Sequence, residues 1–291
     1  MTAALLEPRD LRLLAAWRLN PRRTFAGRVQ GERLTKRRGL SIEFADYREY
    51  VEGDDLRHLD WNVLARLDNA VVKSYRDEED LAVHLLIDAS PSMRFGTPSK
   101  LFAARRLAAA LGSVALAGGD AVYVRVLGRR EPPQPPMRGR PGYSRLMRAL
   151  DGVGEEQAGR LASSLVEFAR TEDRRGIAVL LSDGFDESAS NAIRVLGGRG
   201  FELLFLQIVA DEDLEPILEG DLRLLDEEGG EPVEITANSI VLKEYEKRLG
   251  EHNAELQASV LRAGGRYALV RSRTPLDMLI RDVWRRDGWI A

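Results

Sequence analysis

The fold of this chain is predicted most directly from one stretch, Leu81-Ala82-Val83-His84-Leu85-Leu86-Ile87-Asp88-Ala89-Ser90-Pro91-Ser92. Its first half is an almost unbroken apolar run, which is typical of a central parallel strand covered on both faces. Asp88, Ser90 and Ser92 then follow at every second position. Ligand sites of open α/β sheets lie beyond the carboxyl ends of the strands. These three oxygen-bearing side chains are therefore expected at a sheet edge where a ligand would bind.

The same three side chains predict either a metal site or a structural turn. One carboxylate and two hydroxyls suit a hard divalent cation such as Mg²⁺, which prefers oxygen ligands and keeps some bound water. Asp and Ser are also common in turns, so a capped strand-to-helix turn without an ion is the alternative. Thr97-Pro98 marks the expected start of the next helix, with an N-cap residue followed by proline at the first helical position.

Composition limits the classes of protein to which the chain can belong. Its 291 residues allow one large domain or a domain with an appendage. The absence of cysteine excludes disulfides and thiolate metal sites, and a net charge of -3 argues against a dedicated nucleic-acid-binding protein. No apolar run approaches the ~20 residues of a membrane span, and the N-terminus lacks the features of a signal peptide. We therefore expect a cytoplasmic protein without a membrane span.

A second buried strand, Ile177 to Ser182, also runs into a carboxylate, Asp183. Apolar runs and helical stripes alternate along the rest of the chain. Strands are expected at 121–126, 201–210 and 266–270, and helices at 99–117, 143–150, 157–170, 239–263 and 275–286. This alternation predicts an α/β fold with a doubly wound, mainly parallel, Rossmann-like sheet over residues 81–291. A hairpin with an acidic tip is expected as an insertion at 211–237.

Residues 1–80 are expected to form a β-containing N-terminal appendage, with a helix at 11–19 and a strand at 71–75. Four side chains in it suggest the carboxylate-and-imidazole cluster of a metal-dependent hydrolase: Asp54, Asp55, His58 and Asp60. The alternative is a network of ion pairs between these acids and the nearby Arg48, Arg57 and Arg66. His58 is the only imidazole nearby, whereas catalytic zinc usually takes more nitrogen ligands, which favours the ion pairs.

The motifs resemble two groups of proteins. Asp88-x-Ser90-x-Ser92 after a buried strand, with Ser182-Asp183-Gly184 ending a later one, looks like the metal ion-dependent adhesion site of von Willebrand factor A domains. The N-terminal segment closely resembles the signature of a bacterial domain-of-unknown-function family, number 58. That resemblance extends over nearly the whole chain from Gly39 onward, and its signature includes Asp46, Arg48, Asp54, Asp55, Arg57, His58, Asp60 and Trp61.

The resemblance implies a von Willebrand factor A-like, non-catalytic partner of a MoxR-type AAA+ ATPase, beside whose gene such proteins are typically encoded. Such a pair would assist the assembly or maturation of client proteins in a chaperone-like manner. In an adhesion site of this kind, Asp88, Ser90 and Ser92 would hold Mg²⁺ or another divalent cation, with Asp183 acting directly or through water. One open coordination position would then accept a Glu or Asp of a partner.

One ligand of that pattern is missing from this sequence. Adhesion sites of this type usually take a further ligand from a threonine between the two strands, whereas residues 151–159 contain none. Glu155 or Glu156 could supply a carboxylate instead, or the site could be weakened or empty.

Two other function classes stay open, the hydrolase above and a nucleic-acid accessory protein that uses the basic stretch Arg22 to Arg38. Acidic residues follow that stretch at once and compensate its charge locally. The three histidines are His58, His84 and His252. His84 lies inside the central strand and His252 in a helical stripe, where we expect a structural role. The sequence therefore offers no evident nucleophile-base pair and favours protein binding over catalysis.

Overall fold

The computed structural model describes residues 4–23, 25, 43–51, 59–67, 70–76, 81–129, 134–154, 160–216, 218–224 and 232–291. The chain divides into two compact units, one made of Met1–Arg23 with Leu81–Ala291 and the other of Thr24–Asp80. This corrects the predicted appendage of residues 1–80, because the first 23 residues belong to the larger unit. The physical reason is a set of backbone and side-chain hydrogen bonds that tie residues 18–23 to that unit.

The larger unit is built on a five-stranded sheet in which every neighbouring pair is parallel. Its order is β4 (Ala121–Val126), β3 (Ala82–Ile87), β5 (Gly176–Ser182), β6 (Glu202–Val209) and β9 (Arg266–Arg271). All residues of β3, β5 and β6 are buried, which explains their continuous apolar runs. The predicted doubly wound α/β sheet is confirmed.

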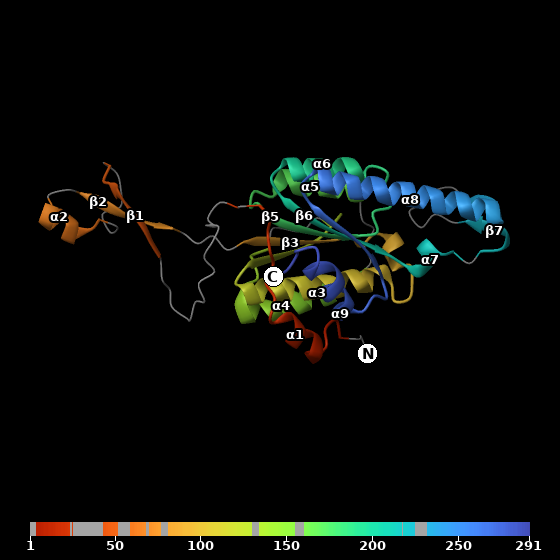
Figure 1. Ribbon diagram of the computed structural model, residues 1–291, viewed down its shortest axis with the longest axis horizontal. Coiled ribbons are helices and arrows are strands. Elements are labelled where there is room, and N and C mark those ends of the chain that lie inside the picture. The colour runs from red at the N-terminus through yellow and green to blue at the C-terminus, as the bar shows by residue number, and fades with distance from the viewer. Residues whose placement is uncertain are drawn as a thin grey trace. The chain divides into compact units, whose positions relative to one another are not determined.

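Helices cover both faces of this sheet (Figure 1). On one face lie α5 (Leu161–Thr171), α6 (Ala189–Gly198) and α8 (Ser239–Arg262). On the other lie α1 (Pro8–Leu14), α3 (Lys100–Gly118), α4 (Gly139–Asp151) and α9 (Leu276–Leu279), and a π-helical segment, Ile280–Arg285, continues α9. Among the described residues, α3 alone is long and apolar enough to cross a membrane, but 72% of its apolar window is buried inside the unit, as in a core helix.

The turn between β3 and α3 differs from the predicted one. A 3-10 turn (Pro91–Arg94) follows the strand, and α3 begins only at Lys100. Ser99 is the N-cap, because its side chain accepts a hydrogen bond from the Phe102 N–H. The prediction of Thr97 as N-cap and Pro98 as first helical residue is therefore wrong by two residues.

Two antiparallel strands, β7 (Gly220–Leu224) and β8 (Val233–Ala237), pair within the segment where a hairpin was predicted. The expected acidic tip, residues 225–231, lies outside the described residues. A short helix, α7 (Asp211–Leu214), precedes the hairpin at the end of β6. Figure 1 shows the hairpin beside the N-terminal end of α8, beyond the body of the sheet.

The smaller unit contains β1 (Glu43–Glu49), which pairs antiparallel with β2 (Val71–Arg76), and α2 (Trp61–Leu67). The predicted strand at 71–75 corresponds to β2. Asp60 is buried and caps α2, since its Oδ1 accepts a hydrogen bond of 3.2 Å from the Val63 N–H. Trp61 is 61% exposed, and Asp46 and Arg48 belong to β1.

Candidate functional site at the strand tips

The tips of β3 and β5 lie side by side at the carboxyl edge of the sheet. The two strands are neighbours, with Ile87 opposite Leu181, and the Asp88 N–H donates to the Leu181 carbonyl at 2.9 Å. Just beyond the strands, the Ser182 hydroxyl donates to Asp88 Oδ2 at 2.6 Å. The structure therefore brings Asp88 and the Ser182-Asp183 tip into one site, as the order of the motifs predicted.

The Asp88 loop folds its hydroxyls close to the carboxylate. The Ser90 N–H donates to Asp88 Oδ1 at 2.9 Å, and the Ser90 and Ser92 hydroxyl oxygens lie 3.1 Å apart in a mutual hydrogen bond. Asp88 itself is almost wholly buried. Burial, and then the nearby charge of Asp183, raise the pKa of the Asp88 carboxyl.

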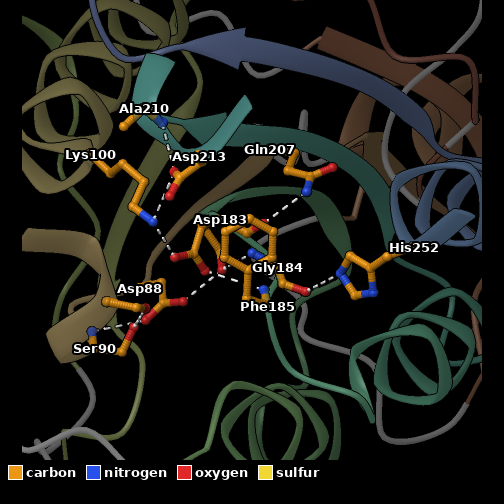
Figure 2. A network of polar contacts seen from close by, with 12 residues as sticks. Asp88, Ser90, Lys100, Asp183, Gly184, Phe185, Gln207, Ala210, Asp213 and His252 are labelled. Atoms are coloured by element: carbon orange, nitrogen blue, oxygen red, sulfur yellow. Dashed lines mark hydrogen bonds and ion pairs between the residues drawn. The ribbon is translucent and has the colours of Figure 1, made fainter. Parts of the chain in front are cut away.

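A buried lysine, which the sequence reasoning missed, completes this site. Lys100 is the first residue of α3 and is only 2% exposed. Its Nζ lies 2.8 Å from Asp183 Oδ2 and 3.2 Å from Asp213 Oδ2, so one ammonium pairs with two carboxylates (Figure 2). A signal was present in the sequence, because a lysine in the first turn of an apolar helix opposes the preference of that end for acidic residues.

A hydrogen-bonded network fixes the backbone around Asp183. Asp183 Oδ1 accepts from the Phe185 N–H at 3.2 Å, and the Asp183 carbonyl accepts from Gln207 Nε2 at 2.8 Å. Gln207 Oε1 in turn accepts from the Tyr267 hydroxyl at 2.5 Å, and burial raises the pKa of Tyr267 to about 12. The site is therefore held from the neighbouring strands β6 and β9 as well as from β5.

His252 belongs to the same network in the structural role that the sequence suggested. Its Nε2 lies 3.0 Å from the Gly184 carbonyl oxygen, and the two residues are joined in Figure 2. Gly184 has a φ of +73°, and a Cβ there would come within 2.9 Å of a Leu256 methyl carbon. Only glycine suits this turn, so β5 ends in a fixed geometry between Asp183 and Phe185.

Two phenylalanine rings flank the buried ammonium. The Lys100 Nζ lies 5.9 Å from the ring centre of Phe95 and 5.1 Å from that of Phe185. Both rings remain accessible to solvent, at 52% exposed for Phe95 and 39% for Phe185. Gly96, with a φ of +94°, allows the Phe95 loop to pass close to Ala210, where a Cβ would come within 2.6 Å of the alanine Cβ. The rim thus presents apolar rings above a buried charge network.

Several of the remaining predicted site residues lie outside the described part of the chain. Glu155 and Glu156 lie outside the described residues, as do Asp54, Asp55, Arg57 and His58. Of the hydrolase cluster only Asp60 is described, and it caps α2. Within the described ranges no group of three or more His, Cys, Asp or Glu side chains is arranged to hold a metal ion. The hydrolase cluster stays a prediction.

The donor atoms present at the strand tips do not fit a divalent ion well. Each oxygen of the Asp88 and Asp183 carboxylates already accepts a hydrogen bond or an ion pair. Mg²⁺ binds oxygen at about 2.1 Å, so an ion on Asp183 Oδ2 would lie within about 5 Å of the Lys100 ammonium. Two buried cations at that separation repel each other strongly.

Comparisons with known proteins identify the family to which the chain belongs. The model of a family described as "Protein of unknown function DUF58" matches residues 46–255. Uncharacterized proteins of Mycobacterium bovis and Mycobacterium tuberculosis are each 28% identical to it over 280 residues, which cover 93% of this chain and 87% of theirs.

Two solved structures are similar to part of the chain. One is the conserved hypothetical protein BatB from Bacteroides thetaiotaomicron, with 18% identity and a TM-score of 0.43 over 66% of this chain and 90% of that one. The other is an aerotolerance-related membrane protein from Bacteroides fragilis, with 19% identity and a TM-score of 0.44 over 71% and 97%. Neither likeness assigns a role to the site.

Proposed function

The chain belongs to the DUF58 family, and we propose that it is a non-catalytic protein-binding module that works in the cytoplasm with a MoxR-type AAA+ ATPase on client proteins. The proposed contact surface is the rim at the carboxyl edge of the sheet, defined by Phe95 and Phe185. The observation that carries the proposal is the exposure of these two rings above the buried network of Lys100, Asp183 and Asp213.

The rim has the features of a prepared protein contact. Exposed aromatic rings provide much of the apolar area that partners bury, and aromatic side chains are enriched in interfaces. Both rings are attached to fixed backbone, since Phe185 follows the bonded Asp183-Gly184 turn and the Phe95 carbonyl accepts from the Lys100 N–H at 3.0 Å. A surface that is ordered before binding loses less entropy when a partner docks.

The charged groups beneath the rim support binding over catalysis. The Lys100 ammonium is engaged with two carboxylates. His84 and His252, the two histidines within the described residues, each bond a backbone carbonyl, of Arg174 and Gly184 respectively. In this part of the chain no histidine is bonded to a serine or threonine hydroxyl, the arrangement that activates such a nucleophile.

Affinity capture from the native cell tests the proposal. The bait is the wild-type chain, and the test bait carries Phe95→Ser with Phe185→Ser. Leu261→Ser is the matched control, because Leu261 is 54% exposed on α8, near the end that leads into the start of β9. We expect a MoxR-type AAA+ ATPase with the wild-type and control baits and its loss with the rim variant. Equal recovery by all three baits, or no such ATPase with the wild type, contradicts the proposal.

A further inference from the structure

We infer that the strand-tip site of this chain works without a metal ion, because the Lys100 ammonium takes the place of the divalent cation that Asp88, Ser90, Ser92 and Asp183 predict. The inference concerns the site itself and does not depend on which partner binds the rim.

Lys100 is an integral, buried part of the site. Its side chain is as buried as the core around it, and burying a charged group is costly unless it is paired and hydrogen-bonded. Two carboxylates from different elements meet that need, Asp183 at the tip of β5 and Asp213 in α7. The ring centres of Phe95 and Phe185 also lie within 5.9 Å of the ammonium, where cation–π attraction adds to the pairing.

Asp213 is itself held in position to pair with the lysine. Its Oδ2 also accepts a hydrogen bond of 2.8 Å from the Ala210 N–H at the end of β6. The Asp213 carbonyl accepts from the Tyr245 hydroxyl of α8 at 2.7 Å. Lys100 therefore joins the tip of β5 to α7, which contacts α8. A covalently attached cation maintains this link permanently, whereas a bound ion could dissociate.

The oxygen atoms that an ion would have to bind already have hydrogen-bond partners. The Ser90 and Ser92 hydroxyls bond each other, and both oxygens of Asp88 accept bonds from Ser90 and Ser182. Asp183 pairs with Lys100 and also accepts the Phe185 N–H. A positive charge thus already lies beside Asp183, the acid that an ion at this site would have to share with Lys100.

A titration with Mn²⁺ alone, read by electron paramagnetic resonance, tests the inference on the full chain without any partner. The wild type is compared with Ser90→Ala, which removes a hydroxyl that any ion at this site would use. We expect both proteins to bind the same amount of Mn²⁺, so that any bound ion lies elsewhere. The inference would be overturned if the wild type bound one more equivalent of Mn²⁺ than Ser90→Ala.

Thermal unfolding provides a second, independent readout. Lys100→Met should lower the unfolding midpoint by several degrees or prevent folding, because Asp183 and Asp213 lose their counter-charge. Lys247→Met is the control, since Lys247 lies on the surface of α8 and should leave the midpoint unchanged. Neither EDTA nor Mg²⁺ should shift the midpoint of the wild type. The lysine's role would be contradicted if Lys100→Met were as stable as the wild type. It would also be contradicted if Mg²⁺ raised the unfolding midpoint of the wild type and Ser90→Ala abolished that rise.

A final readout rests on the proposed function. If the wild-type bait recovers the ATPase, recovery should be unchanged when the bait alone is treated with EDTA and the EDTA is removed before mixing. Loss of the ATPase on chelation of the bait alone, before mixing, would overturn the metal-free site but leave the partner proposal standing. The Mn²⁺ titration needs no partner, so failure of one idea is distinguishable from failure of the other.

Discussion

At the scale of one residue, the position of His84 in the central strand determines its protonation. The ring is fully buried in β3, stacked on Tyr123 and packed edge-on against Phe168 and Phe201. Its Nε2 lies 3.0 Å from the Arg174 carbonyl oxygen. Burial is the main cause that lowers the pKa of His84 from 6.5 to about 4, and the folded chain therefore keeps this histidine neutral at neutral pH.

This shift predicts a loss of stability in mild acid. In the unfolded chain His84 binds a proton below about pH 6.5, whereas in the folded chain it binds one only near pH 4. Protonation therefore favours unfolding as the pH falls through that window, by about 2 kcal/mol between pH 7 and pH 5. Urea unfolding at both pH values measures this. His84→Phe should reduce the pH dependence by that amount, and an unchanged slope would show that His84 is not its source.

The sequence predicted some residues of the strand-tip site and not others. Asp88, Ser90 and Ser92 stand out because they directly follow a buried strand, and Asp183 repeats the pattern one strand later along the sheet. Lys100 and Asp213 could not be found in the same way. Their pairing depends on where α3 and α7 begin. That is set by the 3-10 turn and by the hydrogen bond from the Ala210 N–H to Asp213, which sequence periodicity does not reveal.

At the scale of the element, the start of α3 determines where Lys100 lies. Ser99 caps the helix through a bond of 3.2 Å from the Phe102 N–H. Ser99→Ala should therefore cost about 1 kcal/mol in the free energy of unfolding, the usual value of an N-cap, while Ser99→Thr should restore most of it. Chemical denaturation of the three proteins checks this. Equal losses in the alanine and threonine variants would show that the hydroxyl does not act as a cap.

The pairing of β5 with β3 depends on a glycine. A Cβ at Gly176 would come 2.0 Å from the Ala82 carbonyl oxygen, so Gly176→Ala must move the strand backbone. We expect a loss of about 2 kcal/mol or more, as for other overpacked cores. At Gly250, within α8, a Cβ would meet nothing within 4 Å. Gly250→Ala should stabilise the chain by about 0.5–1 kcal/mol. Chemical denaturation of the two variants measures both free energies of unfolding. Equal destabilisation by Gly176→Ala and Gly250→Ala would contradict the expected difference.

Elements with long apolar runs or stripes were the predictable ones, such as β3, β5 and α8. The predicted helix at 11–19 was displaced, since α1 spans Pro8–Leu14 and begins at the proline. No helix was predicted at α6, Ala189–Gly198, a ten-residue helix whose N-cap Ser188 makes no side-chain hydrogen bond. Its buried residues Ala189, Ala192, Ile193 and Leu196 lie at helical spacing, so a short stripe was present in the sequence without a cap to mark its start.

At the scale of the whole molecule, a buried ion pair holds the N-terminal segment against the rest of the larger unit. Glu202 at the start of β6 pairs with Arg266 at the start of β9. Glu202 Oε2 also accepts the backbone N–H groups of Arg22 and Arg23 at 2.8 and 2.9 Å. Part of the basic stretch that suggested nucleic-acid binding is thus structural, although residues 26–42 lie outside the described ones.

Loss of the Glu202 carboxylate should destabilise the chain, whereas loss of an exposed carboxylate should not. Glu202→Gln leaves the buried Arg266 guanidinium without a counter-charge and should cost about 3 kcal/mol or more. Segment 4–23 should also become more sensitive to limited proteolysis. Glu255→Gln, on the exposed side of α8, should have neither effect. Unchanged stability and cleavage in the Glu202 variant would show that the pair does not hold the segment.

The most direct test of the rim as a protein-binding surface is the dissociation constant between the purified chain and the purified MoxR-type AAA+ ATPase of the same organism. Loss of a buried phenylalanine contact removes about 1.5–3 kcal/mol, so Phe95→Ser with Phe185→Ser should weaken binding at least about tenfold. Leu261→Ser should bind like the wild type. A wild-type chain that shows no saturable binding, or a rim variant that binds as tightly as the wild type, would contradict the proposed function.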